Sequence, residues 1–178
     1  MRRCFTNKMS FAVLAFILLS CKDSSVLEYA PGDNTMVFEM EYVNRAWGFA
    51  YHGTMIDQDG GMYSYNPGKD IDSVLYHADG YYSAQELYSK YQHGKTYLRR
   101  IPGDTVEWSR DLACRVILNN FSDTLRVGAD MGSLNYSVYV YRKEYAKYQK
   151  VILKVEGDFV FYNTSESAVA LVAWMKNV

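Results

Sequence analysis

The chain has 178 residues, which suits one domain of ordinary size, and a formal net charge of −1 from 19 Lys+Arg and 20 Asp+Glu. This balance argues against an electrostatic nucleic-acid binder, so we expect no nucleic-acid partner. A hydrophobic fraction of 49% excludes a disordered chain, and three cysteines cannot build a disulfide framework. The unusual feature of the composition is its 17 tyrosines.

The first 20 residues have the pattern of an export signal. Arg2, Arg3 and Lys8 give a positively charged start, and residues 9–19 form an almost entirely apolar run. A helix of that run is about 16 Å long, far short of the roughly 30 Å hydrocarbon core of a membrane. We therefore predict a signal peptide over residues 1–20 and not a membrane-spanning helix.

The signal ends in the run LLSC at residues 18–21, which resembles the lipobox of bacterial lipoproteins. In that motif a small residue precedes the cysteine whose thiol takes the lipid and which becomes the mature N-terminus. Lys22 and Asp23 are similar, in part, to the export tag of Bacteroidetes surface lipoproteins. The resemblance implies lipidation of Cys21 and stable attachment to the outer membrane, either surface-exposed or on its periplasmic face. An ordinary secretory signal with an accidental cysteine is the alternative.

Removal of the signal changes the charge balance. The signal contains three of the 19 bases and no acid, so 16 bases and 20 acids remain and the net charge becomes −4. Cys4 also lies in the signal, which leaves Cys114 as the one cysteine beyond the lipidation site. We expect Cys114 to be a small buried residue. Residues 21–34 contain the lipidated N-terminus and a short polar tether with turn residues near its end.

The next block, residues 35–66, has the pattern of strands. Residues 36–41 alternate between apolar and other side chains, which is a period of two with one charged face. The pair Asp59-Gly60 lies between the apolar and aromatic runs 47–57 and 62–65. Such a pair accepts positive φ angles, and it predicts a hairpin.

Two helices are expected after an irregular connection at residues 67–82. The run 83–86 (SAQE) has the pattern of a capping box that opens a short helix to His93. The run 104–107 (DTVE) repeats this pattern before a longer helix that we expect to end near Asn119 or Asn120.

Strands return in the last third of the chain. Residues 136–142 alternate so that Tyr139 and Tyr141 lie on the face opposite Val138 and Val140. If the face with Val138 and Val140 packs against helices, the face with Tyr139 and Tyr141 would present an aromatic row to solvent. The favoured interpretation of the tyrosines is half-buried sheet positions with hydroxyls that reach water, and an exposed recognition surface is the alternative.

A turn region at 143–149 and strands at 151–155 and 159–162 follow, and a third capping box at 163–166 opens the C-terminal helix. This order predicts an α+β fold with a largely antiparallel sheet, two central helices and a C-terminal helix packed on it. We expect a single domain over residues 35–178.

Motifs of common enzymes are missing from the sequence. The spacing of His52, His77 and His93 does not match that of metal ligands. The run that begins at Asp57 and Asp59 resembles the start of a calcium-binding loop, but the residues after it do not fit that loop. We therefore expect no catalytic residue, no metal and no cofactor. A hydrolase with converged Asp and His residues is a less favoured alternative.

The favoured hypothesis is a non-catalytic domain that binds a protein or a glycan. Candidate contact residues are Tyr139 and Tyr141 on the aromatic face, and Asp57 and Asp59 at the hairpin. An inhibitor or immunity-type protein that inserts the hairpin tip 57–61 into a secreted enzyme is one alternative. An accessory lipoprotein that stacks tyrosines on sugar rings is another.

Three Asp-Ser or Asp-Thr triplets are similar to the O-glycosylation motif of exported Bacteroidetes proteins. They place candidate sites at Ser73, Thr105 and Thr124. Helix caps and turns use the same residue pairs, so the structural role is the alternative at each position.

The domain as a whole resembles uncharacterised lipoproteins of Bacteroidetes. The matching segments are 46–49 (AWGF), 53–60 (GTMIDQDG) with 63–65 (YSY), 130–132 (DMG), 151–158 (VIL-x-V-x-GD), and 163–168 (N-x-S-x-x-A) with Trp174. The resemblance covers most of residues 42–177. It implies one intact domain and brings no activity, substrate or site residue.

Overall fold

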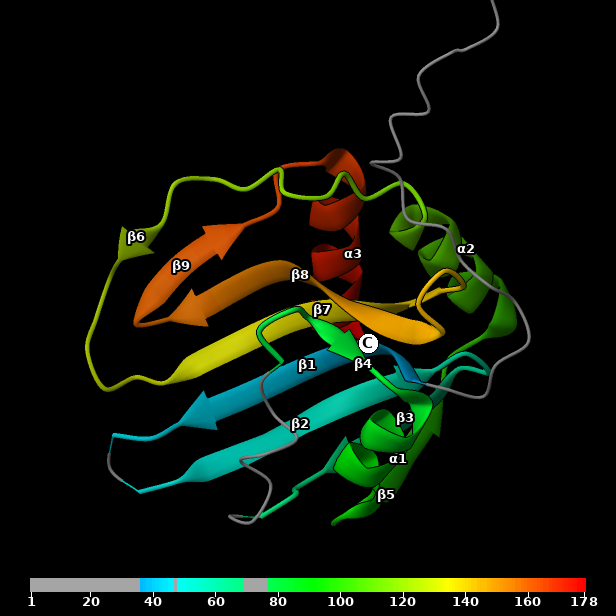
Figure 1. Ribbon diagram of the computed structural model, residues 1–178, viewed down its shortest axis with the longest axis horizontal. Helices are drawn as coiled ribbons and strands as arrows, with labels where there is room; N and C mark the ends of the chain where they lie inside the picture. The colour runs from blue at the N-terminus through cyan, green and yellow to red at the C-terminus, as the bar shows by residue number, and fades with distance from the viewer. Residues whose placement is uncertain (1–35, 47, 69–76) are drawn as a thin grey trace, which may run out of the picture.

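The computed structural model describes residues 36–46, 48–68 and 77–178. Its elements form a curved sheet with helices on both faces (Figure 1). The strands are β1 (Met36–Asn44), β2 (Ala50–Asp57), β3 (Gly61–Tyr65), β4 (Tyr81–Tyr82), β5 (Thr96–Arg100), β6 (Leu125–Arg126), β7 (Ser133–Arg142), β8 (Lys147–Gly157) and β9 (Phe159–Tyr162). The helices are α1 (Ala84–Gln92), α2 (Gly103–Ala113) and α3 (Glu166–Asn177).

Every strand pair in this part of the chain is antiparallel. The order across the sheet is β5-β3-β2-β1-β7-β8-β9-β6, and the short β4 pairs with β8. β1 is therefore a central strand, between β2 and β7, although it comes first in the chain. The α+β fold with a largely antiparallel sheet, two central helices and a C-terminal helix is confirmed.

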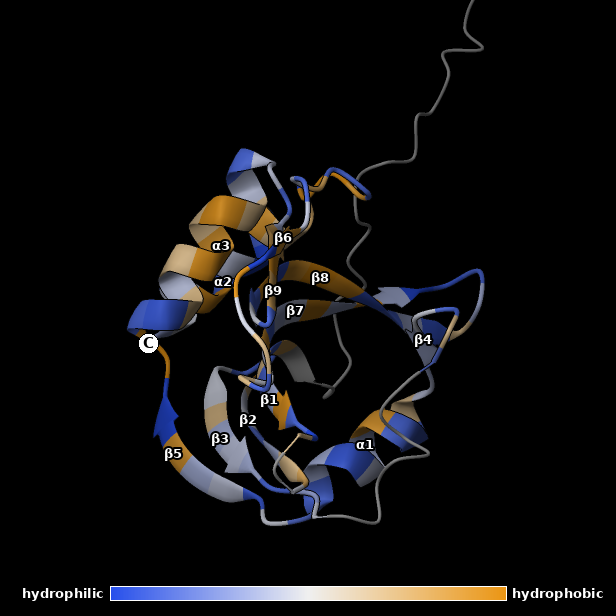
Figure 2. Cartoon of the chain, turned by 90° about the vertical axis from the view of Figure 1, so that its left-hand side faces the viewer, coloured by the Kyte–Doolittle hydropathy of each residue, from blue (hydrophilic) through white to orange (hydrophobic). Residues whose placement is uncertain are grey.

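The two faces of the sheet carry different cores (Figure 2). Side chains of β7 alternate between them, with Val138 and Val140 toward α2 and α3 and Tyr139 toward α1. The core under α2 and α3 is mainly aliphatic and includes Phe38, Val138, Leu153, Leu171 and Met175. The core under α1 is rich in tyrosine and contains Tyr51, Met55, Tyr65, Tyr82, Leu87, Tyr91, Tyr139 and Tyr148.

The predicted hairpin joins β2 to β3. Gly60 has a φ of 82°, a left-handed conformation that favours glycine, and its N–H donates to the carbonyl of Asp57 at 3.0 Å. The side chain of Asp57 also accepts from the N–H groups of Asp59 at 3.0 Å and Gly61 at 2.7 Å. The tight turn is thus held by a carboxylate and by a glycine that can adopt positive φ.

The first predicted capping box is confirmed at α1. The N–H of Glu86 donates to Ser83 Oγ at 3.2 Å, and the N–H of Ser83 donates to Glu86 Oε2 at 2.6 Å. The two reciprocal bonds satisfy backbone donors that a helix start leaves open. They define the start of α1, whereas Lys90 and Tyr91 bond it to the sheet.

The other two predicted boxes are wrong. The N-cap of α2 is Pro102 without a side-chain bond, and Asp104 instead accepts from the adjacent N–H of Thr105 at 2.8 Å. Asn163 does not cap α3, which begins after Ser165. Its Oδ1 accepts from the Ser165 N–H at 3.0 Å while its Nδ2 donates to the Ile117 carbonyl at 2.7 Å, which ties a preceding loop to the start of the helix.

The sequence also predicts too long a second helix and misses short strands. α2 ends at Ala113, and Asn119 has a φ of 58°, which a continuing helix cannot contain. β5, between the two central helices, was not predicted because all its residues are exposed and it lacks an alternating pattern. It is one of the two edge strands of the sheet, paired with β3 on one side, and β6 is the other.

Several sequence-based predictions fall outside the described residues. These are the signal peptide, the lipidation site Cys21, the tether and the candidate site Ser73. Among the helices that the structure does describe, none combines the length and the apolar character needed to cross a membrane.

Candidate functional site: a buried charge network beside an open groove

The charged face of β1 points into the tyrosine-rich core. Glu39 and Glu41 are two residues apart on this strand, so both side chains lie on the same face of the sheet. Glu39 is 0% exposed and Glu41 is 5% exposed. Carboxylates are almost never buried so completely unless they are paired. The buried carboxylates and the groups around them therefore form a candidate functional site.

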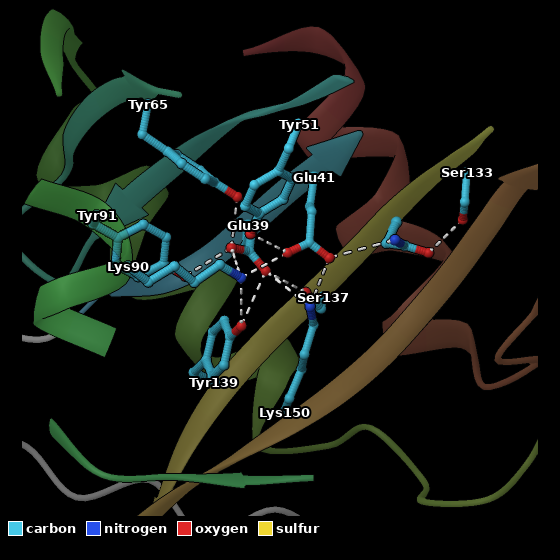
Figure 3. A network of polar contacts seen from close by, with 11 residues as sticks. Glu39, Glu41, Tyr51, Tyr65, Lys90, Tyr91, Ser133, Ser137, Tyr139 and Lys150 are labelled. Atoms are coloured by element: carbon cyan, nitrogen blue, oxygen red, sulfur yellow. Dashed lines mark hydrogen bonds and ion pairs between the residues drawn. The ribbon is translucent and has the colours of Figure 1, made fainter. Parts of the chain in front are cut away.

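Two lysines approach these carboxylates from different elements (Figure 3). Lys90 of α1 places Nζ 2.6 Å from Glu39 Oε1 and 2.6 Å from Glu41 Oε2. Lys150 of β8 places Nζ 3.1 Å from Glu39 Oε2 and 3.0 Å from Glu41 Oε1. Each lysine thus bridges both glutamates, and the two positive and two negative charges sum to zero.

Tyrosine hydroxyls from four elements complete the network. Tyr65 and Tyr91 donate to Glu39 Oε1 at 2.7 and 2.8 Å, and Tyr139 donates to Glu39 Oε2 at 3.0 Å. Tyr51 donates to Glu41 Oε2 at 2.9 Å. These bonds explain part of the tyrosine excess, because each ring fills apolar space while its hydroxyl serves a buried carboxylate.

The electrostatic consequences follow from this pairing. Burial opposes ionisation of Glu39, but the positive charges of Lys150 and Lys90 outweigh it and hold the pKa of Glu39 well below its usual value. Burial and the charge of Glu39 oppose ionisation of Glu41, yet the two lysines still lower its pKa. Burial also opposes the charge of Lys150, and the two glutamates nevertheless raise its pKa. Glu39, Glu41 and Lys150 are therefore held in their ionised forms at neutral pH.

The pKa values of the tyrosines are raised, in contrast to those of the two glutamates. Burial, followed by the nearby negative charges of Glu39 and Glu41, raises the pKa of Tyr65 and Tyr139 well above 10. The same causes raise the pKa of Tyr91, where burial and Glu39 lead. These hydroxyls remain protonated donors across the physiological range.

An open groove lies on the same face of the sheet, next to the network. Its volume is about 580 Å³. The apolar part of its wall is formed by Val43, Ile152, Val155, Phe159 and Phe161, and the polar part by Arg45, Thr124, Ser133, Asn135 and Asp158. The groove is of the size that small ligands occupy in proteins.

One short relay connects the groove to the network. Ser133 Oγ donates to Asn135 Oδ1 at 2.9 Å, and Asn135 Nδ2 donates to Glu41 Oε1 at 3.4 Å. Both Ser133 and Asn135 line the groove. Figure 3 shows this line of polar contacts leading from Glu41 to Ser133.

The aromatic row predicted on β7 is placed differently from the expectation. Tyr139 is 1% exposed, because α1 covers this face and its hydroxyl bonds to Glu39 and Lys90. The alternative that places Tyr139 in a solvent-exposed aromatic row is therefore wrong. Tyr141 is half-buried, with its ring 5.2 Å from that of Tyr148.

The hairpin tip is packed and does not project. Gly60 and Gly61 are buried, and the carbonyl of Gly60 accepts from the N–H of Ile101 at 2.8 Å. Asp57 is engaged in the turn, and only Asp59 of the tip is exposed. The expectation of a tip available for insertion into an enzyme is wrong.

The remaining candidates lie apart from the network. Thr105 is half-buried at the start of α2, whereas Thr124 is exposed at the groove wall. His77 contacts Glu86 at 3.3 Å, and His52 is exposed beside Tyr42.

In the described part of the chain no contact joins His52 or His77 to Asp57 or Asp59. No group of three metal-binding side chains occurs there either. Cys114 is half-buried at the end of α2.

The main site residues, Glu39, Glu41, Lys90 and Lys150, were not singled out from the sequence. A signal was present in α1, where Leu87, Lys90 and Tyr91 are buried and lie at positions i, i+3 and i+4. This spacing places a lysine within the buried stripe of the helix. A buried cation requires a buried partner, and the charged face of β1 could have been proposed for that role.

In comparisons with known proteins, no family model, curated protein or solved structure matched the chain.

Proposed function

We propose that this chain is a lipid-anchored binding protein of the cell envelope, attached through Cys21 and non-catalytic in its folded domain. The non-catalytic part of the proposal rests on the complete hydrogen bonding of the buried glutamates. All four carboxylate oxygens of Glu39 and Glu41 accept bonds from protein donors. The open groove beside them supports binding as the function.

The directions of the pKa shifts support the same proposal. A glutamate that serves as a general acid near neutral pH needs a raised pKa, and a nucleophilic lysine needs a lowered one. Here the pKa of Glu39 is lowered and the pKa of Lys150 is raised. The buried ions therefore stabilise one another in the protonation states that are least useful for proton transfer.

The anchor is supported by the lipobox-like run that ends in Cys21. The test is incorporation of labelled palmitate by bacteria that produce the wild-type chain, Cys21→Ala or Cys4→Ala. Cys4→Ala is a matched control, because it removes a thiol from the predicted signal and keeps the lipobox intact. We expect label in the wild type and in Cys4→Ala and none in Cys21→Ala. Equal labelling of Cys21→Ala would contradict the proposed anchor.

A further inference from the structure

The groove lies at the open end of the face that α1 partly covers. Figure 2 looks toward this end of the sheet, with α2 and α3 on one side and α1 on the other. β1, β7, β8 and β9 all contribute to the groove, so much of its wall is formed by neighbouring strands of one sheet. Sites built on regular elements hold a ligand in a defined position.

One side of the groove is suited to an apolar ligand body. Ile152 and Val155 of β8 and Phe161 of β9 form a continuous apolar wall, since Val155 and Phe161 are direct cross-strand partners. Phe159 extends this wall to the surface, where it is 50% exposed. A large exposed apolar side chain at the mouth of an apolar groove is typical of a binding site.

The opposite wall offers a hydrogen-bond donor. Asn135 uses its Oδ1 to accept from Ser133, and within the described residues its amide nitrogen donates one long bond, to Glu41. An amide nitrogen carries two N–H groups. The second N–H of Asn135 is therefore available to an acceptor atom in the groove.

The charge of the network decides which acceptor fits. Glu39, Glu41, Lys90 and Lys150 already sum to zero and satisfy one another. The groove wall itself adds one cation, Arg45, and one carboxylate, Asp158, so the charges around the groove also sum to zero, and an ionised group placed against Asn135 would add a net charge to this balanced set, which is unfavourable. An uncharged oxygen, in a hydroxyl or a carbonyl group, accepts from Asn135 without that penalty.

We infer that the groove binds an uncharged amphiphile. Its apolar body lies along Ile152, Val155 and Phe161, and its hydroxyl or carbonyl oxygen accepts a hydrogen bond from Asn135. This inference rests on the proposed function, because it names the ligand class of the proposed binding domain.

The test compares three probes that share one chain and differ in charge: dodecanol, dodecanoate and dodecylammonium. Each competes with the fluorophore N-phenylnaphthylamine for residues 21–178 carrying Cys21→Ala, in buffer without detergent. This chain contains every described element and carries no acyl group of its own. We expect dodecanol to bind at least about tenfold more tightly than either ion.

Two pairs of measurements locate the site. Ile152→Glu places a charge in the apolar wall and is expected to weaken both dodecanol and the fluorophore by about tenfold or more. Val160→Glu is the matched control, because Val160 is a half-buried aliphatic residue of β9 that does not line the groove. We expect it to leave both affinities unchanged.

Asn135→Leu separates the hydrogen bond from the apolar contact. It is expected to weaken dodecanol about fivefold and to leave N-phenylnaphthylamine, which has no oxygen, unchanged. Equal weakening of both would show general damage to the groove and overturn the assigned role of Asn135.

The remaining outcomes also decide the inference. Binding of either ion as tight as that of dodecanol overturns the preference for an uncharged head group. Failure of the fluorophore and of all three probes to bind overturns the groove as an amphiphile site. Neither result bears on the palmitate labelling of Cys21, so failure of this inference is distinguishable from failure of the proposed anchor.

Discussion

The face of the sheet under α2 and α3 is closed by aliphatic side chains, whereas the face under α1 is closed by tyrosines and four charges. Aliphatic packing is non-directional, so the loss of one side chain leaves the remaining contacts in place. The charged core depends on complete pairing, because one missing partner leaves another group buried and uncompensated. We therefore expect substitutions on the two faces to destabilise the protein in different ways.

The largest expected effect is on the charged face. Lys90→Met keeps most of the side-chain volume but leaves Glu39 and Glu41 with one cation between them. We expect the free energy of unfolding to fall by about 4 kcal/mol, measured by urea denaturation at neutral pH.

A second substitution makes this prediction specific to charge. Adding Glu41→Gln to Lys90→Met restores neutrality between Glu39 and Lys150, so the double variant should recover part of the lost stability. A double variant no more stable than Lys90→Met would contradict the role assigned to charge balance.

Acidification should lower the free energy of unfolding by about 2 kcal/mol through the charged face and not through the aliphatic face. The pKa of Glu39 is lowered in the folded protein, so its contribution is present above the unfolded pKa of about 4.3 and is lost as the pH falls toward the lower folded value. Between about pH 5 and pH 3 this loss amounts to about 2 kcal/mol for one glutamate. Glu39→Gln should remove it and flatten the pH dependence of the free energy of unfolding.

Leu171→Ala serves as the control from the aliphatic face. Leu171 is 0% exposed, so its truncation should lower stability by about 3 kcal/mol at every pH and keep the wild-type slope. A slope that is the same in Glu39→Gln as in the wild type would contradict the lowered pKa of Glu39 as the source of this pH dependence.

The smallest expected effect concerns the position of α1 over the charged face. Ser83→Ala removes the side-chain acceptor of the capping box and should cost about 1 kcal/mol of stability. Ser89→Ala, a similar change within the same helix, should cost less because Ser89 caps nothing. Thermal denaturation of the two variants tests the difference, and equal losses would exclude a special role for the cap.

Local patterns in the sequence predicted the elements that local physics determines. The alternation in β1 and β7, the Asp-Gly hairpin and the box at Ser83 all depend on residues within a few positions of one another. The two failed capping boxes follow the same pattern as the correct one, a cap-forming residue followed three positions later by Glu. At Asn163 a distant partner, the carbonyl of Ile117, takes the side chain instead.

The charge network could not be assembled from such patterns. Lys90 and Lys150 are separated from Glu41 by 49 and 109 residues, so their meeting depends on the order of strands in the sheet. The alternation in β7 placed Tyr139 on the correct face. What that face would meet depended on where α1 docks.

The edge strand β5 affects whether two copies of the protein can associate. A strand with one unpaired side is a template onto which a second chain can add. β5 is short, ends in Arg99 and Arg100, and is followed by Pro102, which has no N–H to offer. Positive charge and proline are the features that discourage such edge-to-edge pairing. Copies of the protein are therefore not expected to pair with one another through β5.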